Sequence, residues 1–261
     1  MSTGGSVPFD RAAEVYDRTR RLTPEASAAT TELLAQELAD RQPALELGVG
    51  TGLIALPLAE ARVRLVGLDL SRPMLAKIVE KAGGSVPFPL VVGDATRLPF
   101  VDGAFGGAYA RHVLHLIGAW RTALAELVRV VAPGGVLLIN IGFSEGPWQE
   151  IGDRMDEQVG RDGHRVVGLD FDGSDDLDDA MAVFGASHRQ LPEVWQASEL
   201  TLDRYFAEIE AQAFSWTWRV PPDRLSAAVA ETKRWAAERF GAFDRILEPR
   251  FRSVWRAYDL P

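Results

Sequence analysis

Five short apolar segments alternate with helical segments between residues 44 and 143. The apolar segments, which we interpret as β-strands, cover residues 44–49, 63–70, 89–95, 106–112 and 135–143. The segments between them, such as GLIALPLAEA and RPMLAKIVEKA, have the length and apolar spacing of helices. Apolar strands joined by helical crossovers are typical of a parallel sheet buried on both faces. The alternation therefore predicts a doubly wound α/β fold whose ligand lies beyond the carboxyl ends of the strands.

The flanking residues predict additions to this sheet. Residues 1–10 resemble a frayed tail, and helices are expected over about 10–20 and from Pro24 onward, with Thr23 as the N-cap. Residues 191–200 and 248–260 read as two late strands that pair antiparallel at a sheet edge. The helical segments 203–214 and 222–241 lie between them. We expect one domain over 1–261, with N-terminal helices in 1–40, a ligand-binding core in 41–143 and a helical cap at about 202–240.

Composition excludes several functional classes. The formal net charge is −9, which argues against a nucleic-acid or anionic-membrane partner, because both need a basic face. The sequence contains no cysteine, so disulfides and zinc-thiolate sites are excluded. No signal-peptide pattern and no long uninterrupted apolar run occurs. We therefore expect a cytoplasmic protein, a monomer or homodimer, that acts on a small molecule.

The stretch LELGVGTG, residues 45–52, is the sharpest motif. Its glycines follow a G-x-G-x-G pattern, and Leu53 stands where a dinucleotide fingerprint needs its third glycine. Glu46 would repel a pyrophosphate and attract an ammonium or sulfonium group. Asp69 follows Gly48 by 21 positions, close to the spacing at which an acidic residue binds ribose hydroxyls. A ribose with a cationic group and no phosphate fits S-adenosylmethionine. The blander alternatives are Glu46 as a solvent-facing strand end and Asp69 as a helix cap beside Ser71.

Further motifs occur in a recognisable order. They are FDRAAEVYDRTR (9–20), ELGVGTG (46–52), GLDLSRPML (67–75), GDATRLPF (93–100), YARHVLHLI (109–117) and VAPGGVLLIN (131–140). Over about residues 9–143 the chain resembles the class I S-adenosylmethionine-dependent methyltransferases, in particular the type 11 group that includes ubiquinone-biosynthesis enzymes. The resemblance implies a Rossmann-like seven-stranded sheet in the order 3-2-1-4-5-7-6, with the helical cap inserted before the last strand.

The resemblance also implies the cofactor and its contacts. S-adenosyl-L-methionine would be bound and S-adenosyl-L-homocysteine released. Tyr16 and Arg20 would approach the methionine end, Met74 would pack near the adenine, and Asp94 would meet its exocyclic amine, unless Asp94 is merely a turn residue. The full implied set is Tyr16, Arg20, Glu46, Gly48, Val49, Gly50, Gly52, Asp69, Leu70, Met74, Asp94, Ala95 and Arg111.

His112 is the candidate catalytic residue, as a general base facing the methyl acceptor. The alternatives are a packed histidine, which is favoured for His115, and a metal pair of the two, for which no third ligand is evident. We expect no metal site. The acidic run LDFDGSDDLDD does not match a calcium loop and is better explained as the start of a helix.

These features together predict a methyltransferase that acts on a small or medium apolar metabolite by in-line methyl transfer. The acceptor would lie among aromatic residues of the cap, which are either core or pocket lining: Trp195, Tyr205, Phe206, Trp216, Trp218 and Trp235. The alternatives are a non-catalytic cofactor-binding protein and a nicotinamide-dependent oxidoreductase, and Glu46 argues against the second. A nucleic-acid methyltransferase is disfavoured by the negative charge.

Overall fold

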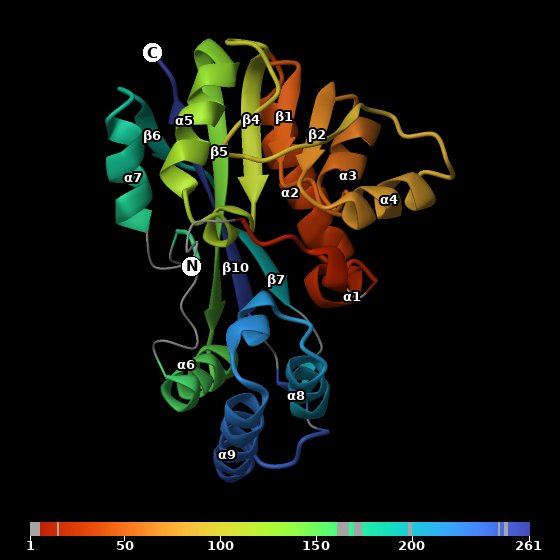
Figure 1. The fold of residues 1–261 in the computed structure, drawn as a ribbon, viewed down its shortest axis with the longest axis vertical. Helices are drawn as coiled ribbons and strands as arrows, with labels where there is room; N and C mark the ends of the chain where they lie inside the picture. Colours follow the sequence, from red (N-terminus) through yellow and green to blue (C-terminus); the bar gives the residue numbers. More distant parts are fainter. Residues whose placement is uncertain are drawn as a thin grey trace.

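The computed structural model describes residues 6–14, 16–160, 167–169, 174–197, 200–244, 246–247 and 250–261. A central sheet forms the upper part of the molecule in Figure 1, and a layer of helices lies beyond the carboxyl ends of its parallel strands. The strand order is β3-β2-β1-β4-β5-β10-β6, with β7 also paired to β10. The doubly wound α/β fold and the strand order expected from the sequence are confirmed.

The parallel half of the sheet follows the predicted alternation. Its strands are β1 (Ala44–Leu47), β2 (Leu65–Asp69), β3 (Leu90–Val92), β4 (Phe105–Arg111) and β5 (Val131–Glu145). The crossovers contain α3 (Ala55–Glu60), α4 (Arg72–Lys81) and α5 (Trp120–Val130). Upstream lie η1 (Asp10–Ala12), α1 (Tyr16–Arg20) and α2 (Pro24–Glu37), and the hydroxyl of Thr23 caps α2 by accepting the Ala26 N–H.

The antiparallel edge differs in detail from the expectation. The edge partner of β10 (Arg250–Asp259) is split into β6 (Ser187–Gln190) and β7 (Val194–Ala197), so the sheet has eight strands rather than seven. Leu191 still donates its N–H to Trp255, at 2.9 Å. Pro192 follows it and has no N–H to offer the ladder. β6 and β7 together take the place of the single strand expected at 191–200. The observed pairing begins earlier in the chain, at Ser187.

Two apolar clusters fill the space between the sheet and its helices. α5 and α7 (Ser174–Ala182) cover one face, and α2, α3 and α4 cover the other. α7 begins with Asp175 and Asp176 in its first turn, as proposed for the acidic run, although residues 170–173 lie outside the described residues. None of the helices in the described ranges is long and apolar enough to cross a membrane.

A third apolar cluster lies apart from the sheet. It joins α6 (Pro147–Val159), α8 (Leu202–Glu210) and α9 (Pro222–Phe240), with η3 (Ser215–Arg219) beside them; we call these four elements the helical layer. The helices α8 and α9 were expected, whereas α6 was not. β5 and β10 extend past the parallel strands toward this layer, as Figure 1 shows. A two-residue pair, β8 (Leu200–Thr201) with β9 (Ile246–Leu247), lies in the connections.

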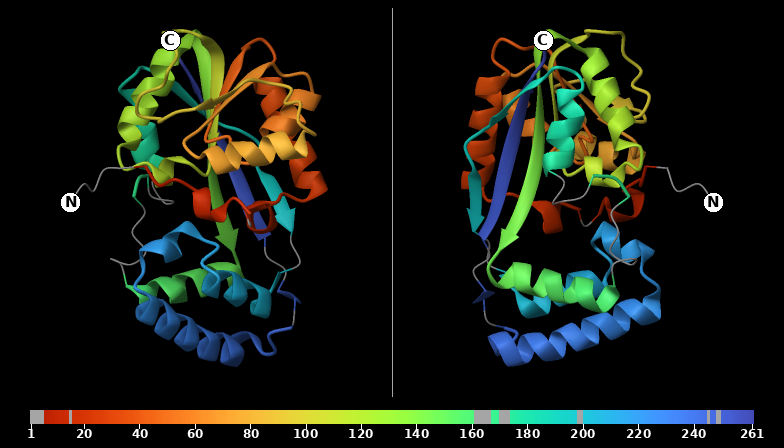
Figure 2. Two further views of the ribbon diagram at one scale, coloured as in Figure 1. Left: turned by 45° about the vertical axis from the view of Figure 1, so that its right-hand side comes forward. Right: turned by 90° about the vertical axis from the view of Figure 1, so that its left-hand side faces the viewer.

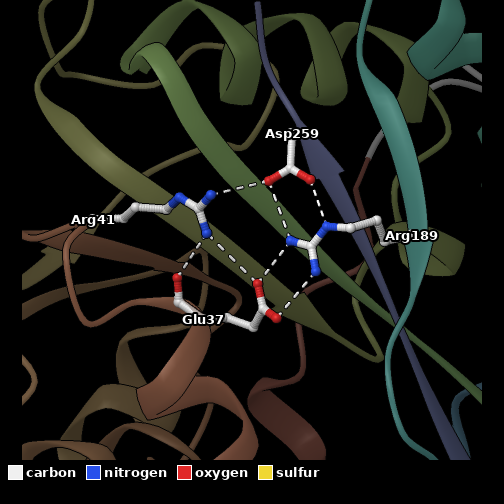
Figure 3. Close-up of polar contacts among 4 residues, drawn as sticks. All are labelled: Glu37, Arg41, Arg189 and Asp259. Carbon is white, nitrogen blue, oxygen red and sulfur yellow. Dashed lines mark hydrogen bonds and ion pairs between the residues drawn. The ribbon is translucent and has the colours of Figure 1, made fainter.

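Four charged side chains tie α2 to the antiparallel edge (Figure 3). Arg189 on β6 donates to both carboxylate oxygens of Glu37, at 3.2 and 2.8 Å, and to both of Asp259, at 2.6 and 3.2 Å. Arg41 reaches the same two carboxylates, at 3.6 and 3.2 Å. Arg189 is the hub, because its planar guanidinium binds both partners in a forked geometry.

Replacing Arg189 with Met should lower the free energy of unfolding in urea by about 1 kcal/mol, near the upper end for exposed ion pairs. The loss should shrink in about 1 M salt, which shortens the screening length to ~3 Å. Arg97→Met, at an exposed arginine without a carboxylate partner in the described part of the chain, is the matched control. Equal effects of the two substitutions would contradict a structural role for the network.

Candidate functional site

The glycine turn follows β1 and adopts a backbone that favours glycine. Gly48, Gly50 and Gly52 have φ values of 71°, 56° and 80°, in the left-handed region. A Cβ atom at Gly48 would lie 2.7 Å from Cγ2 of Val113, so this position also needs the absent side chain. The turn thus brings main chain close to the segment that follows β4.

Asp69, at the end of β2, is bound to this turn. One of its carboxylate oxygens accepts the Gly50 N–H and the other the Ser71 N–H, each at 2.8 Å. The N-cap of α4 is Ser71, whose hydroxyl accepts the Met74 N–H, so Asp69 is not the cap residue. A carboxylate has about four lone-pair positions, which leaves capacity for ligand hydroxyls. Burial raises the pKa of Asp69.

A pocket with about 600 Å³ of empty space, part of it open to solvent, lies beside the turn and Asp69; we call it the larger cavity. Eight of the residues expected in the site line it: Tyr16, Gly48, Gly50, Asp69, Leu70, Met74, Ala95 and His112. These residues come from the N-terminal segment, the glycine turn, the end of β2, the start of α4 and the loops after β3 and β4. Met74 and Ala95 are buried, and with the carboxylate of Asp69 they give the cavity an apolar part and a polar part.

The other expected residues lie outside the cavity lining. Val49 packs in the core below the turn, and Gly52 begins the approach to α3. Asp94 is exposed, and its Oδ1 accepts from both the backbone N–H and the hydroxyl of Thr96, at 2.9 Å each. These hydrogen bonds form a local turn, which was the alternative interpretation of Asp94 in the sequence. Three more expected residues also lie outside the lining of this cavity: Glu46, Arg20 and Arg111.

Glu46 is buried in β1 with 3% of its surface exposed. The Tyr109 hydroxyl donates to its Oε2 at 2.9 Å. Burial raises the pKa of Glu46 to about 8, against the opposing effects of Tyr109 and the nearby charge of Arg111. The solvent-facing alternative for Glu46 is wrong. The residue is a buried carboxyl group below the glycine turn, and it is largely protonated at neutral pH.

Two arginines lie near this part of the site, and Arg111 interacts with the charges of both Glu46 and Arg20. Arg111 ends β4, and its charge interacts with Tyr16, Arg20 and Glu46. Arg20 ends α1; its Nη1 donates to the Thr19 carbonyl at 3.3 Å, and its guanidinium carbon lies 4.9 Å from the ring centroid of Phe214. Burial lowers the pKa of both guanidinium groups. Within the described residues, neither guanidinium forms an ion pair with a carboxylate.

His112 lies where the cofactor-side cavity meets a second one. It also lines a cavity of about 380 Å³, together with Val113, His115, Asn140 and Gly142. The backbone of His112 is left-handed, with φ of 51°, which is uncommon for a residue with a side chain. Burial, followed by the charges of Arg111, His115 and Arg20, holds its pKa well below the usual value. Burial likewise lowers the pKa of His115 to about 3. Both imidazoles are therefore neutral at physiological pH.

The sequence missed the contribution of the residues that precede η1. Ser6, Val7 and Phe9 line the larger cavity, and the Val7 N–H donates to Leu116 at 3.1 Å, so this part is not a frayed tail. The sequence did contain one signal of this contact, the two apolar residues Val7 and Phe9 ahead of the helical segment. Figure 2 shows the N-terminal segment passing between the sheet and the helical layer.

The N-terminal segment is also fastened to the glycine turn. Asp17 accepts the hydroxyl of Thr51 and pairs with Lys81, while Lys81 donates to the Thr51 carbonyl at 2.8 Å. Toward the helical layer, the ring of Phe9 lies 4.9 Å from that of Trp218. The segment therefore connects the two parts of the molecule across the cavities.

The fold and the site define a nucleoside-binding domain of the Rossmann-like type, with a carboxylate at the end of the second strand and a glycine turn after the first. Residues 45–139 match the model of a family described as a methyltransferase domain, Methyltransf_11. Over these residues the chain is thus similar to class I S-adenosylmethionine-dependent methyltransferases of the type 11 group.

Similar proteins agree with this assignment. The chain is 36% identical over 144 residues to a demethylmenaquinone methyltransferase of Streptomyces avermitilis, covering 54% of this chain and 60% of that protein. It is 31% identical over 135 residues to a malonyl-[acyl-carrier protein] O-methyltransferase of Legionella pneumophila, covering 51% and 48%. These matches span about half of the curated relatives' length.

The fold is also similar to that of a solved structure, a putative type II methyltransferase from Anaeromyxobacter dehalogenans. The TM-score is 0.61 at 18% identity, with 92% of this chain and 98% of the other covered. The structural similarity therefore includes the antiparallel edge of the sheet, beyond the residues that match the family model. At this sequence identity it concerns the fold alone.

The buried carboxyl of Glu46 predicts a pH-dependent stability. The folded protein keeps a proton on Glu46 that the unfolded chain releases above its ordinary pKa of 4.5, so stability should fall as the pH rises from about 4.5 to about 8. Glu46→Gln retains an acceptor for Tyr109 and has no proton to lose. Its stability relative to the native protein should increase by on the order of a few kcal/mol between about pH 5 and pH 8.5.

Urea unfolding at the two pH values measures this difference. Glu60→Gln, at an exposed glutamate of α3, is the matched control and should show little pH-dependent change. A constant difference between Glu46→Gln and the native protein across this pH range would show that Glu46 titrates normally.

Proposed function

We propose that this protein transfers a methyl group from S-adenosyl-L-methionine to a small molecule and releases S-adenosyl-L-homocysteine. The observation that carries the proposal is the hydrogen bond between the glycine turn and Asp69 beside an open cavity, in residues that match a methyltransferase domain. A phosphate-binding role is disfavoured because the carboxylate of Asp69, which lines the cavity, would repel the phosphate.

The lining residues suggest how the cofactor is held. The free lone pairs of Asp69 would accept the ribose hydroxyls, and the buried Met74 and Ala95 would pack on the adenine. Leu70 continues that wall. Glu46 and Arg111 lie on the side of the methionine group, where a carboxyl and a guanidinium complement an ammonium and a carboxylate. When bound, the cofactor supplies a methyl group on a sulfonium, which becomes a neutral thioether as the methyl leaves.

The protein's own task is to position the acceptor. Holding the acceptor in line and excluding water can contribute on the order of 7–11 kcal/mol in favourable cases. We propose that His112 contacts the acceptor, since it lines both cavities. Its neutral imidazole is in the form needed to accept a proton, and its lowered pKa makes it a weak base. His112 therefore suits an acceptor that has little or no proton to give up.

We propose that the helical layer, together with the N-terminal segment, caps the acceptor site. Phe9, Phe214 and Trp218 lie where the two meet. Two of the expected aromatic residues do not fit a pocket: Trp195 lies on β7 with 47% of its surface exposed, and Phe206 is fully buried within the layer. The remaining aromatic surface favours an acceptor with an apolar body.

Calorimetry should show binding of S-adenosyl-L-homocysteine in the micromolar range and little binding of NAD. Asp69→Ala should weaken that binding by about 1.5–3 kcal/mol, the usual loss for hydrogen bonds to a charged group. Asp94→Ala in the same titration tests the proposed adenine contact. Tighter binding of NAD, or an unchanged dissociation constant for Asp69→Ala, would contradict the site as proposed.

Turnover is tested separately, because a cofactor site alone does not establish catalysis. Protein incubated with methyl-labelled S-adenosyl-L-methionine and fractionated small-molecule extracts should transfer label to an extractable product. Asp69→Ala should reduce that transfer at limiting cofactor. Binding of S-adenosyl-L-homocysteine with no labelled product in any fraction would favour the alternative, a non-catalytic cofactor-binding protein.

A further inference from the structure

We propose that the methyl acceptor carries an –NH–CHR–C(=O)– unit, as an N-acylated amino acid amide does, and that the main chain of Gly142 binds this unit at an open edge of β5. The inference rests on the proposed function and narrows its substrate class. It gives a binding role to main-chain atoms, which no sequence motif reveals.

β5 continues beyond the end of its neighbour β4, as Figure 1 shows. The pairing of the two strands ends with Arg111 beside Asn140, whereas β5 runs on to Glu145 and stays paired with β10 on its other side. Beyond Asn140, the edge of β5 that faced β4 therefore has no neighbouring strand in the described part of the chain. An unpaired strand edge presents N–H and C=O groups that can pair with an added extended segment.

The ladder between β5 and β10 determines which main-chain groups face this open edge. The Leu260 N–H donates to the Gly135 carbonyl at 2.9 Å and continues the register of the ladder. Hydrogen-bonded and non-hydrogen-bonded residue pairs alternate in an antiparallel ladder, so the odd-numbered residues of β5 bond to β10. The N–H and C=O of Gly142, which lies opposite Ser253, therefore point to the open edge. Within the described residues, the Gly142 main chain forms no hydrogen bond.

Gly142 lines the smaller of the two cavities, next to His112, the proposed contact of the acceptor. A Cβ atom at position 142 would lie 3.2 Å from Cε1 and 3.7 Å from Nε2 of His112, so the imidazole packs where a side chain would stand. A group bound to the Gly142 main chain would thus lie beside His112, which also lines the larger cavity. The open edge is therefore placed to hold an acceptor next to the proposed cofactor.

The arrangement of donor and acceptor selects the group that binds. In an extended strand the N–H and C=O of one residue point to the same side, and the residue opposite pairs with them through its own C=O and N–H. An –NH–CHR–C(=O)– unit supplies both groups, whereas a carboxylate has no N–H to donate to the Gly142 carbonyl. Leu114, Ile139 and Ile141 line the same cavity and suit an apolar R group.

The test uses the native chain saturated with S-adenosyl-L-homocysteine and two probes of nearly the same shape. One is N-acetyl-L-phenylalaninamide, and the other is the ester in which oxygen replaces its acetylated N–H. We expect the amide probe to bind at least about tenfold more tightly, because the ester cannot donate to the Gly142 carbonyl and leaves it unpaired.

Hydrogen exchange of single main-chain amides tests the contact directly. The Gly142 N–H should exchange readily in the native chain with S-adenosyl-L-homocysteine alone, and the amide probe should slow it at least about tenfold. The Ile141 N–H, which faces β10 in the ladder, is the internal reference and should be protected with and without the probe.

Gly142→Pro removes the main-chain N–H without breaking the ladder to β10, since this N–H faces the open edge. It should weaken binding of the amide probe about tenfold, which corresponds to the loss of one hydrogen bond. Gly142→Ala keeps the N–H and is the matched control for the added carbon beside His112. It should retain the preference for the amide over the ester. Thermal unfolding and S-adenosyl-L-homocysteine binding show that each variant is folded.

Several results would overturn the inference and leave the proposed function intact. They are equal affinity for the two probes, no binding of either probe, unchanged exchange of the Gly142 N–H, and equal affinity of Gly142→Pro and Gly142→Ala for the amide probe. If Gly142→Pro does not fold, the probe pair and the exchange measurement decide on the native chain alone. Failure of the native protein to bind S-adenosyl-L-homocysteine contradicts the proposed function itself.

Discussion

The antiparallel pairing of β5 with β10 runs through ten residue pairs, from Val136 with Asp259 to Glu145 with Arg250. Its first half lies within the sheet, beside β4, and its second half leaves the parallel strands behind. The helical layer begins directly after β5 and ends shortly before β10, so this one ladder sets the distance between the layer and the glycine turn. The smaller cavity borders this ladder, because residues 139–142 of β5 line it.

Burial, which removes water from the ionisable groups near the glycine turn, is the main cause of their pKa shifts. Glu46 and Tyr109 are buried and Tyr16 and the two arginines are half-buried, and burial shifts the pKa of each toward the neutral form. Such a cluster is costly without a ligand, since a charge in a low-dielectric site needs a partner nearby. The ammonium and the carboxylate of the proposed cofactor would supply such partners to Glu46 and Arg111.

The sequence predicted the parts of the structure that depend on local pattern. The apolar strands, the helical crossovers and the left-handed glycines each have a signal within a few residues, and β1 to β5 lie where that signal placed them. Contacts between distant segments have no such signal. Three contacts depend on how separate elements pack: the hydrogen bond from the Gly50 N–H to Asp69, the burial of Glu46 against Tyr109 and the placement of Arg20 against Phe214. The break of the edge strand at Pro192 was readable, whereas α6 became evident only from its packing on α9.

The N-terminal segment has a consequence for the order of events in the site. Besides the hydrogen bonds of Val7 and Thr51, its ties to the core include the ion pairs of Asp17 and Glu14 with lysines of α4, and pairs near the surface contribute only about 0–1 kcal/mol each. The same segment touches the helical layer through Phe9 and Trp218. A displacement of the segment therefore opens the cofactor cavity and loosens the acceptor side in one movement. Under the proposed function, binding of the cofactor and binding of the acceptor would then be coupled, and this coupling is reciprocal in free energy, so a ligand that tightens one site tightens the other.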